Sequence, residues 1–422
     1  MASRRLILVP LALLILLGLV NLWTESETSV GIDYFQYWAA GRIVREGLVP
    51  DLYAAGAGPR MAAIFNARAA AAGEPRFKAA AEFRKEEIQI ASTPFLYALV
   101  TLPSGGDFET DFRRHRVILL ACTLPSLVLL SCSLGYSAEG ALAFLAFVIW
   151  AFTPLRNDLF DGNVNGIQLA LLTLYLFLHR RGGNVAVSLA AGAVLGLAVA
   201  FKPNLAFVPV ALAILWIANG RYRHLLVRSV GAAGGVAVAV LGSALLFGSP
   251  SPWIAWLRTL SQLERRFDLG VSWGNFGGAR LLKEAFGVDA SPILFAGVLA
   301  ILALAVFMGR ERHPEGKGGL DAEFLMVGVG PLVPILASGL AWPHYLVLAL
   351  PLSLYLLRPR GSAPWFPWAV LAALFGISSE PALRALHLDS DLAVALGLLG
   401  GTFLLFALAC RDAMAYREEG AP

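Results

Sequence analysis

Asp33 is the first residue of this chain whose type and surroundings could carry out chemistry. The stretch VGIDYFQYWAAGRIV places this single carboxylate among aromatic rings. A carboxylate at such a position either caps the start of a helix or acts as a general base toward a substrate hydroxyl. Helical spacing puts Asp33, Gln36 and Tyr37 on one face, and it leaves Tyr34 and Trp38 on another face that is apolar enough to rest on lipid. In the catalytic interpretation Asp33 is the base and Tyr37 lies beside the substrate.

A second group of polar side chains lies in the segment NDLFDGNVNGIQ, residues 157–168. A turn at Gly162 would account for the first of them. Asn165 and Gln168 nevertheless continue into an apolar helix, where a solvated turn should already have ended. This pattern favours a polar lining that faces a sugar, with Asn163, Asn165 and Gln168 as substrate-binding residues.

Lys202 is a lone cation between the apolar segments 184–201 and 203–219. One interpretation is a lysine that extends its ammonium to the membrane interface. The other is a phosphate-binding cation, because a helix that starts at Pro203 would add its own preference for anions. The sequence leaves both interpretations open.

The segment VSWGNFGGAR combines aromatic rings with glycines, an amide and a guanidinium. No strand leads into it and no Gly-Lys-Ser/Thr follows, so it is not a nucleotide-binding loop. Trp273 and Phe276 could stack on a sugar or a prenyl group, while Asn275 and Arg280 supply hydrogen-bond donors. The alternative is a loop that is anchored by its aromatic residues.

His344, in LAWPHYL, opens another apolar segment beside Trp342 and Tyr345. Aromatic residues of this kind are common at the membrane interface, and the alternative role for His344 is a hydrogen bond to substrate. No histidine pair at helical spacing, no cysteine and no acidic cluster accompanies it in the sequence. We therefore predict neither a metal site nor a cofactor.

A membrane protein must position these side chains. The 422 residues are 58% hydrophobic and 15% charged, against about 25% charged in soluble domains. The net charge of +4 is spread over short loops, as membrane orientation requires, so nucleic-acid binding is excluded. A membrane span needs about 20 apolar residues. We predict an all-α polytopic fold with about twelve spans, at 6–23, 116–134, 138–154, 164–179, 184–201, 203–219, 225–248, 290–309, 322–340, 344–358, 364–378 and 389–410.

The distribution of basic residues predicts the orientation of these spans. Both termini would be cytoplasmic, and the long segments 24–115 and 248–289 would be extracytoplasmic. The run 94–103 is too short to cross and is bracketed by prolines, so we expect a re-entrant or surface helix. The whole chain, 1–422, is then one integral membrane domain in the plasma membrane, with its polar candidates gathered outside the cytoplasm.

The order of the motifs resembles glycosyltransferase family 87, the polyprenol-phosphate-mannose-dependent mannosyltransferases of the GT-C superfamily. The similar segments are DYFQYWAAGRIV, STPFLYALVTLP, GNVNGIQLALLTLYLFLHRRG, AGAVLGLAVAFKPNLAFVPVALAILW, WGNFGG and WPHYLVLALPL. The resemblance implies a GT-C-like fold with surface helices in a large first extracytoplasmic loop, a lipid-phosphate sugar donor, and an essential acid that matches Asp33. This chain departs from the family at Gly162–Asn163, where Gly-Gln is frequent, and at His344–Tyr345, where His-His is frequent.

The function expected from these residues is sugar transfer from a polyprenyl-phosphate donor to a lipid or glycan acceptor among the membrane lipids. A single carboxylate is enough for an inverting transfer, because a phosphodiester leaves without an acid. A lipid flippase or small-molecule transporter is the alternative. It should show internal repeats and charges near the middle of its spans, and the sequence shows neither.

Overall fold

The computed structural model is helical, and no strand occurs in the part of the chain that it describes. The described residues are 2–49, 51–182, 184–266, 269–309, 318–358, 363–388 and 390–415.

Each of the twelve predicted apolar segments overlaps one helix or two consecutive helices. In chain order they are α1 (Ala2–Ser26), α6 (Phe108–Ser133), α7 (Ala138–Ala151) with α8 (Thr153–Asp161), α9 (Asn165–Arg180), α10 (Val185–Phe201), η1 (Pro203–Ala206) with α11 (Phe207–Ala218), α12 (Tyr222–Phe247), α15 (Ser291–Gly309), α16 (Gly318–Val329) with α17 (Leu332–Ala337), η4 (Pro343–Ala349) with α18 (Leu350–Leu357), α19 (Phe366–Ile377) and α21 (Asp391–Ala415).

Five of these helices are long and apolar enough to cross a membrane, namely α1, α6, α12, α15 and α21. The bent pair α7 and α8, whose axes differ by 60°, would make a sixth if it forms one span. Several other apolar helices have only 10–17 residues, so their length alone does not make them spans. The protein is an integral membrane protein, and the full count of twelve crossings stays a prediction.

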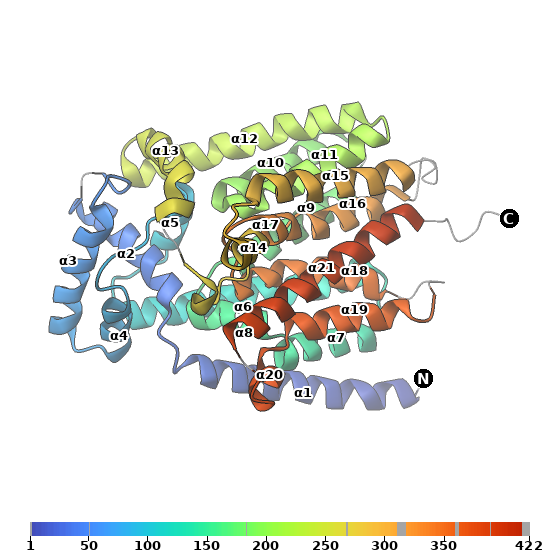
Figure 1. Ribbon diagram of the computed structural model, residues 1–422, viewed down its shortest axis with the longest axis horizontal. Helices are drawn as coiled ribbons and strands as arrows, with labels where there is room; N and C mark the ends of the chain where they lie inside the picture. Colours follow the sequence, from blue (N-terminus) through green and yellow to red (C-terminus); the bar gives the residue numbers. More distant parts are fainter. Residues whose placement is uncertain are drawn as a thin grey trace.

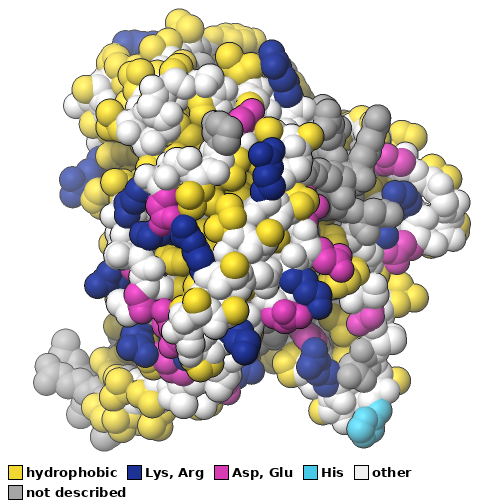
Figure 2. Space-filling view, turned by 90° about the vertical axis from the view of Figure 1, so that its left-hand side faces the viewer, with side chains coloured by type: hydrophobic (Ala, Val, Ile, Leu, Met, Phe, Trp, Pro, Cys, Tyr) yellow, Lys and Arg dark blue, Asp and Glu magenta, His cyan; other side chains and the backbone are white. Residues whose placement is uncertain are grey.

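The helices that lie outside these twelve segments are called the short helices here, because each has at most 16 residues. They are α2 (Ile32–Glu46), α3 (Ala57–Ala72), α4 (Pro75–Phe83), α5 (Pro94–Thr101), α13 (Ser251–Arg266), η2 (Val271–Trp273), α14 (Gly278–Phe286) and α20 (Glu380–Ala385). Figure 1 shows α2, α3, α4 and α13 at the end opposite the start of α1 and the end of α21. Figure 2 views that end, where acidic and basic side chains are interspersed over the surface. Helices therefore occur in both segments that the sequence predicts as long loops, 24–115 and 248–289.

Aromatic packing holds α2 to its neighbours. The rings of Tyr34 and Phe112 stack at 5.4 Å, and the Trp38 ring lies 5.4 Å from both Phe77 and Phe108. Tyr34 and Trp38 are only 2% and 4% exposed. The expectation that these two rings rest on lipid is therefore wrong. Helix α2 packs against other helices on several sides. The rings of α3, α4 and α6 cover Tyr34 and Trp38, and the helical spacing of α2 alone does not predict these contacts.

Thr93 fixes α5 against the end of α10. Its hydroxyl donates to the carbonyl of Phe201 at 3.0 Å and accepts from the amide of Leu96 at 3.1 Å, so it caps α5. The short run predicted not to cross is therefore a helix that packs beside Lys202.

A buried charged cluster joins four helices near the N-terminal end of α12. Arg228 donates to Glu323 of α16 at 2.8 Å, and Glu323 also accepts from Tyr175 at 2.7 Å and from Trp216 at 2.8 Å. Arg228 and Glu323 are 3% and 0% exposed. Because each charge has a partner and further hydrogen bonds, the pair is tolerated inside the helix bundle.

Candidate active site

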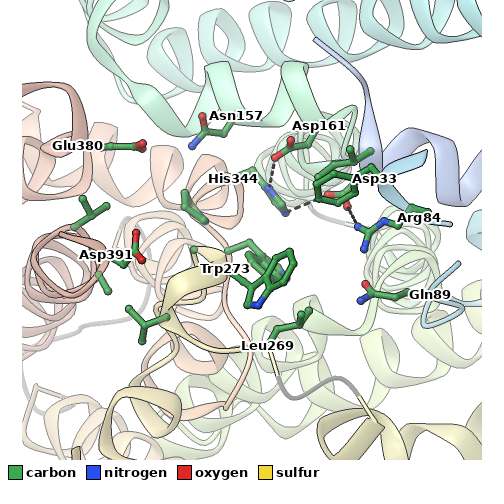
Figure 3. A pocket seen from close by; sticks show the side chains of 18 of the residues that line it. Asp33, Arg84, Gln89, Asn157, Asp161, Leu269, Trp273, His344, Glu380 and Asp391 are labelled. Carbon is green, nitrogen blue, oxygen red and sulfur yellow. Dashed lines mark ion pairs between the residues drawn. The ribbon is translucent and has the colours of Figure 1, made fainter. Parts of the chain in front are cut away.

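A cavity of about 860 Å³ opens where the short helices meet α8, α21 and the start of η4. Three of the residues predicted from sequence line it: Asp33, Trp273 and His344. Figure 3 shows Asp33, Asp161 and His344 together on one side of this cavity, with Arg84 beside Asp33.

Asp33 is the second residue of α2 and does not cap it. The N-cap position is Gly31, which has a left-handed φ of 70° and no side-chain hydrogen bond. The capping interpretation of Asp33 is therefore wrong. Its carboxylate, 18% exposed, instead accepts from Gln36 at 3.1 Å and lies 4.0 Å from the guanidinium of Arg84.

Asn163 connects the carboxylate to a cation. Its Nδ2 donates to Asp33 Oδ2 at 2.6 Å, and its Oδ1 accepts from the Lys202 ammonium at 2.8 Å. Gly162 makes this geometry possible, because the chain turns out of α8 there with a φ of 66°. The amide of Asn163 then donates to the carbonyl of Asp158 at 2.9 Å, which closes the turn.

His344 lies between two carboxylates. Its Nε2 is 2.8 Å from Asn163 Nδ2 and 3.8 Å from Asp33 Oδ2, while its Nδ1 is 3.4 Å from Asp161 Oδ2. Because Asn163 donates to Nε2, the neutral ring carries its proton on Nδ1, which faces Asp161.

The expectation that no acidic cluster accompanies His344 is wrong. One oxygen or nitrogen from each of Asp33, Asp161 and His344 lies within 4.8 Å of the others, an arrangement that could hold a metal ion. Asn163, however, already hydrogen-bonds both Asp33 Oδ2 and His344 Nε2. Arg84 adds a positive charge 4.0 Å from Asp33. A cation would have to displace these contacts, so the residues present suit a hydrogen-bonded site better than a metal centre.

The Lys202 ammonium points into this network. Besides its bond to Asn163 it lies 4.6 Å from the centre of the Tyr345 ring. Tyr345 stands where a second histidine is frequent in the family that the sequence resembles. Burial lowers the pKa of Lys202 to about 8, although the charges of Asp33 and Asp158 act in the opposite direction.

Tyr37, Asn165 and Gln168 lie behind the cavity wall. Tyr37 is 7% exposed, and the two amides are fully buried. Asn165 Nδ2 donates to Asp158 at 2.7 Å, and Gln168 Nε2 donates to Asn204 at 2.6 Å. None of the three lines the cavity. Asn165 supports the turn that carries Asn163, and Gln168 joins α9 to η1.

The glycine-rich segment divides into one exposed ring and several structural residues. Trp273 is 62% exposed and lines the cavity, whereas Phe276 is fully buried. Asn275 donates to the carbonyls of Leu269 and Gly339, both at 2.8 Å, so it anchors the loop. Arg280 donates to Glu284 at 2.7 Å and does not line the cavity. The structure thus gives no support for Asn275 and Arg280 as substrate donors.

Arg84 is the cation of the site that sequence reasoning missed. It lies in the run EFRKEE just after α4, a charge pattern typical of a solvated surface. Only the tertiary structure brings it to Asp33.

The fold and the site define an integral membrane protein of helices with a carboxylate–amide–lysine network at a polar cavity. The family model of glycosyltransferase family 87 matches residues 93–333, more than half of the chain, so the protein belongs to this family. Asp33 and His344 lie outside the matched residues. No curated protein and no solved structure matches the chain. The protein is therefore a membrane glycosyltransferase, and the family favours an enzyme over the transporter.

Proposed function

We propose that this protein transfers a sugar, mannose in the first instance, from a polyprenyl-phosphate donor to a hydroxyl of a lipid or glycan acceptor on the extracytoplasmic side of the plasma membrane. The observation that carries the proposal is the chain of contacts from the Asp33 carboxylate through Asn163 to the Lys202 ammonium. A base and a cation linked by one amide suit a reaction in which a hydroxyl loses a proton while a phosphate accumulates charge.

In this reaction the acceptor oxygen forms a bond to the anomeric carbon of the sugar. Asp33 takes the proton of the hydroxyl, and the bond from the anomeric carbon to the phosphate oxygen breaks on the opposite face. The polyprenyl phosphate leaves with the electron pair, so a β-linked donor gives an inverted product. No acid is needed, because the leaving phosphate is stabilised by positive charge alone.

We assign the phosphate to two cations. Arg84 lines the cavity beside Asp33, whereas Lys202 does not line it and donates to Asn163. Arg280 does not line the cavity either. Asn163 positions both ends of the network, because its amide donates to the base while its carbonyl accepts from the lysine.

The Asp33→Asn variant tests the base. Asparagine keeps the size of the side chain but cannot take a proton, so we expect transfer to fall by about 10²–10⁴-fold, the usual contribution of a general base. Because Gly31 occupies the N-cap, α2 loses no capping bond and the melting temperature should stay near wild type. The measurement is transfer of label from polyprenyl-phosphate-mannose, and from donors with other sugars, by the purified full chain in lipid nanodiscs.

Asp51→Asn is the matched control for this variant. Asp51 is an exposed acid in the loop between α2 and α3. Its Oδ1 accepts from the Tyr53 amide, a bond that asparagine can keep. It should transfer sugar like wild type. Full activity of a well-folded Asp33→Asn variant would remove Asp33 as the base and make Asp161 the next candidate, since it lines the same cavity.

A further inference from the structure

Asp158 is a buried carboxyl group that the proposed reaction does not use. It precedes Asp161 by three residues on α8, but the two side chains have different surroundings. Asp161 lines the cavity and faces His344 (Figure 3), whereas Asp158 is 0% exposed and does not line the cavity. An acceptor hydroxyl in the cavity has no access to a fully enclosed carboxyl, so Asp158 is not a base for the transfer.

The carboxyl of Asp158 holds the first turn of α9 instead. Its Oδ1 accepts from the backbone N–H of Asn165 at 3.3 Å, and its Oδ2 accepts from the backbone N–H of Gly166 at 3.1 Å. The first N–H groups of a helix have no partner inside that helix. Val164, at the N-cap position of α9, makes no capping hydrogen bond with its side chain. Asp158 therefore caps α9 from the preceding helix.

Asn165 connects this cap to Asn163. Its Nδ2 donates to Asp158 Oδ1 at 2.7 Å and to Asn163 Oδ1 at 3.3 Å. The backbone N–H of Asn163 donates in turn to the carbonyl of Asp158 at 2.9 Å. Asp158 thus holds the chain at Asn163 through its carbonyl and just after Asn163 through its carboxyl.

This support matters because the side-chain amide of Asn163 must point in one direction. Its Nδ2 donates to Asp33 at 2.6 Å. Its Oδ1 accepts from Lys202 and from the backbone N–H of Val164, both at 2.8 Å. An amide turned by 180° would present its oxygen to the carboxylate and its NH₂ group to the ammonium, so both contacts would be lost.

We propose that Asp158 is a positioning residue of the sugar transfer, because it fixes the Asn163 amide between the base and the lysine. The proposal rests on the proposed function for the roles of these two groups. Both carboxyl oxygens act as acceptors, one for Asn165 and one for Gly166. Asparagine has a single acceptor oxygen, so Asp158→Asn must place an NH₂ group against one of these donors.

A double-mutant cycle of Asp158→Asn with Asn163→Ala separates positioning from stability. The readout is kcat for transfer from polyprenyl-phosphate-mannose by the full chain in nanodiscs. Asp158→Asn should lower kcat by about 10–100-fold when Asn163 is present, and by no more than about twofold when Asn163 is already alanine. A residue that only stabilises the fold would lower kcat by the same factor in both backgrounds, and that result would overturn the proposal.

Acetylation of Lys202 gives the same cycle without sugar transfer. Acetic anhydride is applied at pH 10, where Lys202, with a pKa of about 8, is neutral, so the rate reports access to the amine and not its charge. Mass spectrometry compares Lys202 with Lys78, an exposed lysine of α4. Asp158→Asn should raise the rate at Lys202 severalfold when Asn163 is present and leave it unchanged in the Asn163→Ala background.

Asp111→Asn is the matched control. Asp111 is a buried carboxylate of α6, 2% exposed, that also accepts from two backbone N–H groups, those of Gly105 and Gly106. This variant should leave the acetylation of Lys202 at the wild-type rate. Its effect on kcat should be the same with and without the Asn163 side chain.

Asn165→Leu carries the test if Asp158→Asn does not fold. Leucine keeps the size of the side chain and leaves Asp158 its two backbone donors. We expect a smaller loss of kcat in the same direction, which again disappears in the Asn163→Ala background. A loss of equal size in both backgrounds would overturn the proposal in this variant too.

The two readouts distinguish this proposal from the proposed function. If wild type transfers no sugar while the acetylation of Lys202 follows the expected pattern, the proposed function is refuted and the hold of Asp158 on Asn163 is kept. If wild type transfers sugar, but Asp158→Asn leaves the acetylation of Lys202 unchanged in both backgrounds, the positioning role alone is refuted.

Discussion

Burial lowers the pKa of Lys202 to about 8, so its charge changes at mildly alkaline pH. With a pKa of about 8 its ammonium is protonated below that pH and loses its proton as the pH rises through it. If Lys202 holds the donor phosphate, the KM for donor should rise above pH 8 in wild type. Lys202→Arg should give a KM that stays flat, because arginine remains charged, and Lys202→Ala should raise the KM at every pH. Steady-state kinetics on both sides of pH 8 provide the measurement. Identical pH profiles in all three proteins would leave Lys202 without a role in donor binding.

Metal removal gives a second prediction at this scale. Asn163 already bonds the facing atoms of Asp33 and His344, so we expect transfer to proceed without a divalent ion. Treatment with EDTA should leave the rate within about twofold of the untreated enzyme, a change of well under 1 kcal/mol in activation free energy. A large loss that Mg²⁺ or Mn²⁺ restores would instead make the three residues a metal centre.

The sequence predicted which single residues belong to the site better than it predicted which residues they contact. Asp33 and His344 stand out because polar groups are rare and costly in an apolar chain. Arg84 does not stand out, because it lies in a charged run where a cation is ordinary. The contact of Asp161 with His344 joins residues far apart in the chain, and no local spacing encodes it. The side chain of Asn275 is of a type that could bind substrate, yet its amide hydrogens are donated to the backbone carbonyls of Leu269 and Gly339.

At the scale of the element, the turn from α8 into α9 depends on Gly162. Its positive φ of 66° is costly for other residues, by about 1–2 kcal/mol. A Cβ there would also lie 2.6 Å from Tyr34 and 2.7 Å from Phe112. Gly162→Ala should therefore lower the melting temperature by several degrees and reduce transfer further by moving Asn163. Gly135→Ala is the control, since Gly135 also has a positive φ but has open space at its Cβ. If both variants lost equal activity, the contacts of Gly162 would not matter.

Hydropathy predicted the presence of the helices well. It did not predict where each helix starts or where a 3₁₀ turn precedes it. Where the first turns of a helix are polar, the predicted apolar segment begins after the true start of the helix. Helix α6 starts at Phe108 and is capped by Asp107, whereas the apolar segment begins at residue 116. In two other segments a 3₁₀ turn precedes the α-helix, and these turns begin at Pro203 and at Pro343. Hydropathy reports burial in lipid or protein equally, and it therefore cannot separate a span from a buried short helix.

At the scale of the whole molecule, the arrangement allows a direct test of orientation. The short helices lie at the end opposite the termini (Figure 1), and we predict that this end is extracytoplasmic. In a variant without the three native cysteines, Ala71→Cys on α3 should react with an impermeant thiol reagent in intact cells. Tyr222→Cys, exposed at the start of α12, should react only after permeabilisation. The opposite labelling pattern would place the cavity on the cytoplasmic side and end the proposal of an extracytoplasmic reaction.

The pairing of Arg228 with Glu323 bears on how the protein is made. Helix α12 leaves the ribosome long before α16, so Arg228 enters the membrane without its carboxylate. An unpaired arginine costs about 2.5–3.5 kcal/mol at the centre of an inserting helix and less toward its ends, where Arg228 lies. The rings of Tyr175 and Trp216, about 5 Å away, offset part of this cost. Only a chain that has been synthesised through α16 can close the pair. A truncated chain would therefore keep Arg228 without its carboxylate partner. A membrane protease could recognise this unpaired charge and degrade unfinished copies of the protein.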